Sequence, residues 1–403
     1  MKVLVASGVV HAFTPEAARA LGRPFTDERV AAAGRANAAP WPTPSEEIWR
    51  YSRIGELSLD RFAAGHLDTV VSGGGTSASV ASGGAALTSF PVVIDGDAPD
   101  LFADLNAAFS DAVVVTVPAG TVVPEPIVVT HHAPDLNAVV FPRLVIDAGE
   151  DSEVTVVERF TSADGELLVV PVVQIRAAQA ARVKYLGVNE LSDLAWQIGH
   201  QQAVGGGDSN TMLGTVALGG HYARVRTEAR LSGRGGNTRQ IALYFAGGTQ
   251  MHDFRTIQDH DAPHTTSDLL FKGAVQDVSA SIYTGLIKIR PQAVGTAAYQ
   301  TNRNLTLGEG AWAKSVPNLE IETNDVKCSH ASTVGPIDPE QLFYIESRGV
   351  PTQVAERLVV LGFFDEVLGH LPVPALAAEL RSRVAAKLDL DSLHPSQRRD
   401  GAA

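Results

Sequence analysis

The chain has 403 residues, of which 45% are hydrophobic, so a sizeable core is expected and global disorder is not. Its 45 acidic residues outnumber its 32 basic ones, and the net charge of −13 argues against non-specific binding to nucleic acid and to anionic membranes. The single cysteine excludes an internal disulfide framework and fits a reducing cytosol. The apolar start, residues 1–10, is too short for a secretory signal, and no apolar run approaches the roughly 20 residues of a membrane span. The predicted location is therefore cytoplasmic.

Residues 1–88 are predicted to form a helical region that ends in a linker. Helices are expected over 15–21, which has a proline near its start, and over 26–33, which has acidic residues in its first turn. The segment 72–84 is rich in glycine and serine, a composition typical of a mobile loop or linker. Its role is left open.

Residues 89–335 are predicted to form a strand-rich core. Many short apolar or alternating runs, such as 113–117 and 182–188, are separated by turns rich in Gly, Asn and Asp, with no helical pattern between them. This excludes a doubly wound α/β sheet and leaves a sandwich, a barrel or a β-solenoid. We favour the solenoid because the strands run on for so long without a long loop, although no sharp sequence repeat is present.

Residues 336–403 are predicted to form a C-terminal helical domain. Asp338 is a good N-cap and is followed by a proline at the first helical position. Gly362 is expected to stop the second helix. The helices are expected, in order, over 339–347, 351–361, 363–368 and 375–388.

The segment 252–264 holds three histidines and three aspartates, the residue types of a hydrolytic metal site. It suggests an alternative function, a stand-alone β-helix metal-dependent hydrolase or lyase that would use the His252–His264 cluster. Against this, no His-Glu-x-x-His motif is present, and Asp259, His260 and Asp261 would alternate between the two faces of a strand. Carbohydrate-active β-helices are also usually secreted.

The only cysteine, Cys328, lies two residues before His330 in the run Asp325-Val-Lys-Cys-Ser-His330. On a strand these two side chains would share one face, and Lys327 would point to the other. Thiolate and imidazole are ligands for iron, zinc or copper, but two ligands are too few for a closed site. The alternative is a buried thiol beside a hydrogen-bonded core histidine.

Three segments resemble the SufB/SufD family, the scaffold subunits of the SUF iron–sulfur cluster assembly machine. The C-terminal one runs from Asp325-Val-Lys-Cys-Ser-His330 into Asp338-Pro-Glu-Gln-Leu-Phe-Tyr344. Glu46-Glu-Ile-Trp-Arg-Tyr51 and the stretch from Asp259 to Ser267 resemble two further family elements. The chain is most similar to the SufD branch, because Gln300-Thr-Asn-Arg-Asn304 stands where the SufB branch carries a cysteine.

The resemblance implies a mainly β fold, a right-handed parallel β-helix flanked by N-terminal and C-terminal helical domains. It also implies a non-enzymatic subunit that pairs with a SufB-like subunit and docks a SufC-like ATPase through its C-terminal helices, with a homodimer as an alternative assembly. No cofactor would be bound stably by the isolated chain. A transient iron or Fe–S cluster would form at the SufB interface, with His330 and Cys328 as ligands. Phe343, Tyr344 and Arg348 are the residues predicted to contact the ATPase, although core packing explains the two aromatic residues equally well.

Overall fold

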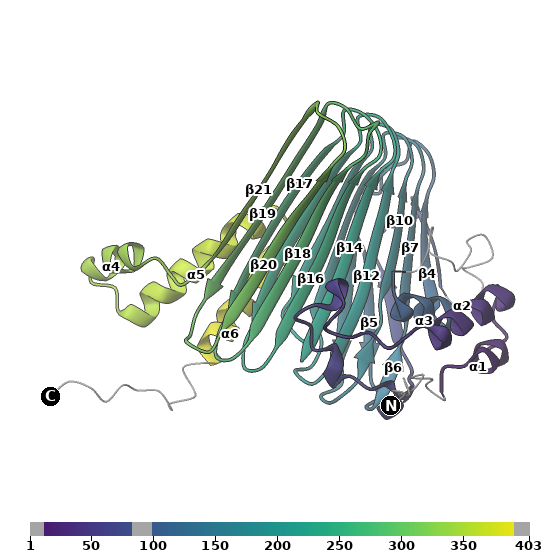
Figure 1. The fold of residues 1–403 in the computed structure, drawn as a ribbon, viewed down its shortest axis with the longest axis horizontal. Helices are drawn as coiled ribbons and strands as arrows, with labels where there is room; N and C mark the ends of the chain where they lie inside the picture. Colours follow the sequence, from purple (N-terminus) through teal and green to yellow (C-terminus); the bar gives the residue numbers. More distant parts are fainter. Residues whose placement is uncertain (1–11, 83–98, 391–403) are drawn as a thin grey trace, which may run out of the picture.

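The computed structural model describes residues 12–82 and 99–390 and is built around a long β-solenoid (Figure 1). From β10 onward, successive strands alternate between two facing sheets, here called sheet A and sheet B, and each pairs in parallel with the neighbouring strands of its own sheet. Sheet A comprises β4 (Asp111–Val117), β6 (Ala138–Val140), β7 (Pro142–Ala148), β9 (Leu168–Val169), β10 (Val172–Ala177), β12 (Trp196–Gly205), β14 (Tyr222–Leu231), β16 (Met251–His260), β18 (Ala280–Ile289) and β20 (Trp312–Ile321), together with β1 and β3. Sheet B comprises β5 (Ile127–Ala133), β8 (Glu153–Ser162), β11 (Arg182–Glu190), β13 (Asn210–Ala217), β15 (Asn237–Ala246), β17 (Thr266–Val275), β19 (Thr296–Thr306) and β21 (Val326–Gly335), together with β2.

The register of the strands sets which side chains enter the core. In sheet A, Tyr222 pairs with Met251, Met251 with Ala280 and Ala280 with Trp312, without a slip in any of these ladders. Because side chains alternate along a strand, every second position of each coil faces the space between the sheets. The predicted mainly β solenoid is therefore confirmed, and the sandwich and barrel alternatives are excluded by the parallel pairing that runs from β4 to β20 in sheet A and from β5 to β21 in sheet B.

The first coils are covered by the N-terminal part of the chain. Strands β2 (Asp68–Ser72) and β3 (Ser79–Ser82) pair antiparallel with β5 and β4, one on each sheet. The described part of the Gly/Ser-rich stretch thus lies on the end of the solenoid. The N-terminal region also contains α1 (Pro15–Ala20), α2 (Thr26–Ala38), η1 (Glu47–Trp49), η2 (Ile54–Glu56), η3 (Leu59–Arg61), β1 (Ala63–Ala64) and α3 (Leu101–Phe109).

The segment around η1 crosses the outer face of sheet A and is held there by buried charges. The Trp49 side chain is buried, and Arg224 donates a hydrogen bond to the Ile48 carbonyl (2.7 Å). Arg255 donates to the Arg50 carbonyl (2.8 Å). Asp253 accepts hydrogen bonds from both arginines, and these two charges hold the pKa of its carboxyl below the usual value despite burial. The Glu-Glu-Ile-Trp-Arg-Tyr motif is therefore an anchor to the solenoid.

The C-terminal helices lie against sheet B, at the opposite end of the molecule from α1 and α2 (Figure 1). They are α4 (Pro339–Ser347), α5 (Thr352–Leu368) and α6 (Pro374–Leu390). The prediction that Gly362 ends a helix is wrong, because α5 continues through it. One glycine costs only about 1 kcal/mol inside a helix, and burial of Leu361 and Phe364 against sheet B outweighs that cost.

Candidate functional site

The last coil leaves one end of the solenoid open. Strands β20 and β21 are the terminal strands of sheets A and B, and no described strand pairs with their outer edges. Several inward-facing apolar side chains of this coil, Leu319, Ile321 and Val334, are about two-fifths exposed. Free edges beside exposed apolar groups are suited to pairing with the strands of another chain.

Cys328 and His330 lie on β21, on the inner face of this open end. Their register partners on β19, Ala298 and Gln300, are buried in the interior, which fixes the direction of the pair. Lys327 pairs with Ala297 and faces outward, as the sequence predicts. The two candidate ligands are therefore neighbours on one face.

The environments of these two residues differ. The Cys328 thiol is half-buried against the last core cluster, which includes Ile287, Ile289 and Ala298, and this burial raises its pKa. His330 is exposed. The alternative interpretation as a buried thiol beside a core histidine is therefore wrong. His330 lies on the terminal strand of sheet B, and no further coil of the described chain packs over it.

Beneath His330, the inner face of β19 is polar. Asn302 donates to the Tyr244 hydroxyl (3.0 Å), Tyr244 donates to Asn304 (2.7 Å), and Asn304 donates back to Asn302 (2.8 Å). Gln300, next along the same face, is buried, yet apart from a weak contact with the Tyr283 hydroxyl its amide atoms have no hydrogen-bond partner among the described residues. Sequence reasoning gave Gln300 no role at this site, because only the register with His330 identifies it.

The histidines of segment 252–264 do not converge. His252 and His260 are buried near opposite ends of β16, whereas His264 is exposed in the following turn, with φ of 58°. His260 lies 2.8 Å from both the Thr265 and Ser267 hydroxyls. Burial lowers the pKa of His252 to about 3 and that of His260 to about 4, so both are neutral core residues.

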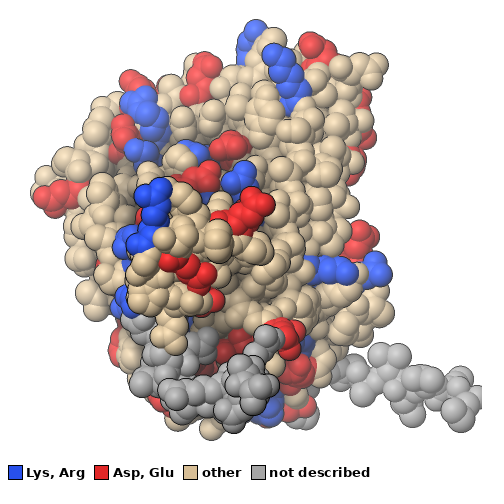
Figure 2. Space-filling view, turned by 90° about the vertical axis from the view of Figure 1, so that its left-hand side faces the viewer, with Lys and Arg blue, Asp and Glu red and all other residues tan. Residues whose placement is uncertain are grey.

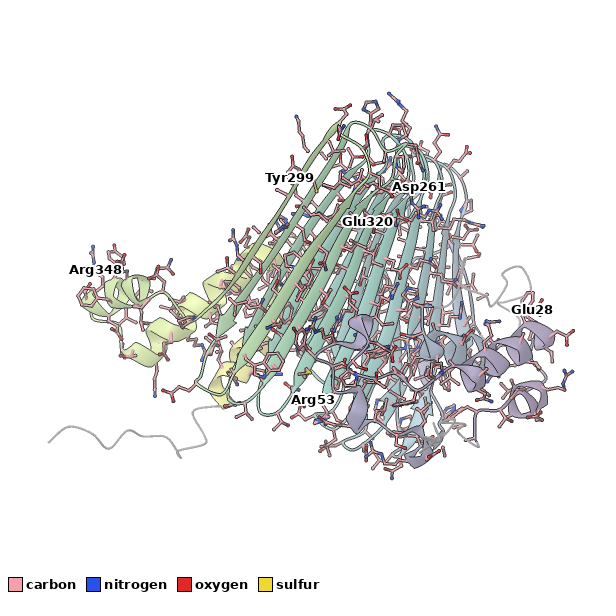
Figure 3. All side chains as sticks on the ribbon, in the orientation of Figure 1. Glu28, Arg53, Asp261, Tyr299, Glu320 and Arg348 are labelled. Atoms are coloured by element: carbon pink, nitrogen blue, oxygen red, sulfur yellow. The ribbon has the colours of Figure 1, made fainter. Side chains whose placement is uncertain are left out.

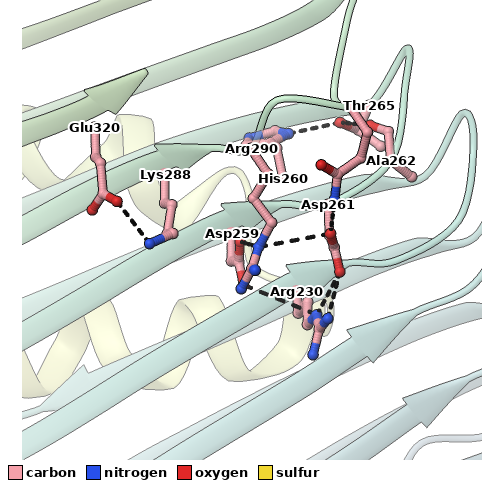
Figure 4. Close-up of polar contacts among 10 residues, drawn as sticks. Arg230, Asp259, His260, Asp261, Ala262, Thr265, Lys288, Arg290 and Glu320 are labelled. Carbon is pink, nitrogen blue, oxygen red and sulfur yellow. Dashed lines mark hydrogen bonds and ion pairs between the residues drawn. The ribbon is translucent and has the colours of Figure 1, made fainter. Parts of the chain in front are cut away.

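The aspartates of the same segment lie on the outer face of sheet A, in an ion-pair ladder across three coils (Figure 4). Arg290 donates to Asp259 (2.8 Å), and Arg230 donates to Asp261 (3.0 Å). The described residues contain no group of three or more His, Cys, Asp and Glu side chains that could hold a metal ion. The alternative of a hydrolytic metal site in segment 252–264 is therefore contradicted by the structure.

Helix α4 carries the exposed aromatic residues. Phe343 and Tyr344 are 70% and 60% exposed, and no residue of α4 is buried, so the core-packing explanation for these aromatics is wrong. Arg348, labelled at the tip of the molecule in Figure 3, lies with its guanidinium 5.1 Å from the centre of the Tyr344 ring and donates to its hydroxyl (3.2 Å). A groove of about 560 Å³ runs beside α4 and is lined by residues that include Tyr344 and Leu358.

The surface around these helices carries no large patch of one charge sign. Figure 2 views the side that carries β21 and the C-terminal helices, and it shows acidic and basic side chains interspersed between wide uncharged areas. No helix in the described ranges is long and apolar enough to cross a bilayer. The fold thus defines a two-sheet β-solenoid protein that is covered at its first coil and open at its last, with an exposed aromatic helix beside the open end.

Comparison with known proteins places this fold in a family. The model of the SUF system FeS cluster assembly SufBD core domain matches residues 129–363. A Mycobacterium tuberculosis protein described as an iron–sulfur cluster assembly SufBD family protein is 34% identical over 368 residues, which cover 87% of this chain and 90% of that protein. The SufD proteins of Escherichia coli and Bacillus subtilis are each 30% identical, over 60% and 68% of this chain and 58% and 63% of their own lengths.

The chain therefore belongs to the SufB/SufD family and is SufD-like within it. Its role is in iron–sulfur cluster assembly. The SufB/SufD resemblance predicted from the Cys328–His330 and Asp338–Tyr344 segments is confirmed.

Proposed function

We propose that this chain is a non-enzymatic scaffold subunit that pairs with a SufB-like subunit through the open end of its solenoid. The observation that carries the proposal is the position of Cys328 and His330, side by side on the inner face of a terminal strand whose edge is free. A partner strand added to this edge would cover both side chains. The nascent cluster is the cargo of this interface and not a resident cofactor of the chain.

His330 is the proposed iron ligand because its imidazole is exposed and not committed to the core. Cys328 is the auxiliary ligand or support. Since burial raises the pKa of its thiol, binding of a cation is needed to favour the thiolate at neutral pH. Two side chains leave a cluster incompletely ligated, so the partner supplies the remaining ligands.

The C-terminal helices are the proposed docking surface for a SufC-like ATPase. Phe343 and Tyr344 provide exposed aromatic area, and Arg348 stacks on Tyr344 at the rim. Aromatic and arginine side chains of this kind dominate binding energy at protein interfaces. Helix α5 connects this surface to the solenoid through Lys272, which donates to the Phe363 carbonyl (2.8 Å).

The test is purification of the tagged full chain with a SufB-like subunit and a SufC-like ATPase of its own organism, followed by iron and sulfide analysis. His330→Ala should leave the complex intact but remove most of its iron and sulfide. His264→Ala is the matched control, because that histidine is also exposed but lies in a turn between β16 and β17. Unchanged iron in the His330→Ala complex would refute the ligand role, and failure of the wild-type chain to recover either partner would refute the scaffold role.

A further inference from the structure

We propose that Gln300 is a positioning residue of the open end, which hydrogen-bonds to the His330 imidazole once a partner strand covers that end. The inference rests on the proposed role of His330 as a ligand. Gln300 itself would not contact iron. It would act only by holding the imidazole of His330, the proposed iron ligand, in one orientation.

The first argument is the contrast along the inner face of β19. Asn302 and Asn304 satisfy one another and the Tyr244 hydroxyl, and the Ser281 hydroxyl lies 3.1 Å from Asn304. Gln300 is 2% exposed, and apart from a weak contact with the Tyr283 hydroxyl its amide atoms have no hydrogen-bond partner in the described structure. A buried amide left unpartnered costs about 1–3 kcal/mol, so a side chain of this kind calls for an explanation beyond stability.

The second argument is the place of Gln300 in the coil. It pairs in register with His330, and the two side chains face the same interior space one strand apart. Its amide reaches across to sheet A, where Gly285 makes room for it: a Cβ on that glycine would collide with the Gln300 amide and the Tyr283 hydroxyl. Gln300 therefore forms the floor of the open end, directly below His330.

The third argument is the chemistry of the amide. It carries two donors and one acceptor, so it can bond to whichever ring nitrogen of His330 does not face the ligand position. Ligating histidines commonly have such a partner on the second nitrogen, which fixes the orientation of the ring. In the isolated chain the His330 imidazole is exposed, so water competes with the Gln300 amide for hydrogen bonds to its ring nitrogens. A partner strand would exclude that water and strengthen the bond.

Two measurements test this inference. The complex with the SufB-like subunit, loaded with ferrous iron and sulfide and then reduced, is examined by pulsed electron paramagnetic resonance for the ¹⁴N couplings of a coordinated imidazole. Gln300→Leu should shift these couplings and weaken iron binding about tenfold. Gln240→Leu, which changes a buried glutamine of β15 two coils deeper in sheet B, should leave them unchanged.

The second measurement needs no metal. The isolated chain carrying Gln300→Leu should melt near or above the wild-type temperature, because only a weak contact with the Tyr283 hydroxyl is lost. Asn302→Ala should melt lower. Destabilisation by Gln300→Leu equal to that by Asn302→Ala would assign the amide a structural role and overturn the inference.

The two proposals fail separately. If His330→Ala abolishes the ¹⁴N couplings while Gln300→Leu leaves them as in the wild type, the ligand role stands and the positioning role is refuted. If His330→Ala also leaves the couplings unchanged, both are refuted.

Discussion

The guanidinium of Arg224 lies 4.0 Å from the centre of the Trp49 ring, and both side chains are fully buried between the N-terminal segment and sheet A. The same guanidinium donates to Asp253 (2.9 Å). This contact joins residues far apart in the sequence and attaches the N-terminal region to the middle coils of the solenoid. A cation over an indole ring that is shielded from water contributes about 2 kcal/mol beyond the buried area.

Trp49→Ala is expected to detach the N-terminal segment. Loss of a buried tryptophan costs about 3–5 kcal/mol. The urea unfolding midpoint should fall, and limited proteolysis should cleave first near residues 46–56. Trp312→Ala provides the control, because Trp312 is 41% exposed on β20, the terminal strand of sheet A, and its loss should change the midpoint little.

Lys387 is expected to make stability rise with pH in the alkaline range. Its ammonium, on α6, donates to the carbonyls of Leu218 (2.5 Å) and Phe245 (2.9 Å) and to the Gln250 side chain (2.7 Å), and burial lowers its pKa to about 8. Above that pH the folded chain has released a proton that the unfolded chain retains up to about pH 10, so the free energy of unfolding should increase, by at most about 3 kcal/mol.

This pH dependence is measured by urea unfolding of the wild type and of Lys387→Met between about pH 7.5 and 10. The range extends from the pKa of Lys387 in the folded chain to near that of lysine in the unfolded chain. The difference between the two proteins should move in favour of the wild type as pH rises. Parallel curves for the two proteins would show that Lys387 does not titrate in this range.

Phe343→Ala combined with Tyr344→Ala is expected to weaken binding of the SufC-like ATPase at least about 30-fold, because exposed aromatic anchors of this kind contribute 2 kcal/mol or more. The melting temperature should stay near that of the wild type, since neither side chain is buried. Calorimetric titration with the purified ATPase provides the measurement. Tyr299→Ala removes an exposed aromatic residue from the outer face of β19 and serves as the control, so an equal loss in both variants would contradict the proposed surface.

Cys328 is expected to lose its reactivity when the SufB-like subunit binds. The thiol is half-buried in the free chain, and a strand added to β21 would cover it. Because the chain has one cysteine, alkylation by iodoacetamide followed by intact-mass analysis reports on this position alone. The rate should fall at least about tenfold in the complex, in line with the burial of an interface core. An unchanged rate would place the partner elsewhere.

The sequence by itself determined the local features of this protein. Asp338 and Pro339 mark the start of α4, and alternating apolar residues mark the strands. The two-residue spacing places Cys328 and His330 on one face of a strand. These properties could be predicted because they depend on neighbouring residues only. Only the tertiary structure decided which coil is last and therefore leaves His330 exposed. It also decided that Gly362 lies inside a helix, that the histidines of segment 252–264 are separate core residues, and that Gln300 lies below His330. The helix through Gly362 depends on packing of α5 against sheet B, and the other outcomes depend on pairing between strands about 30 residues apart in the stacked coils.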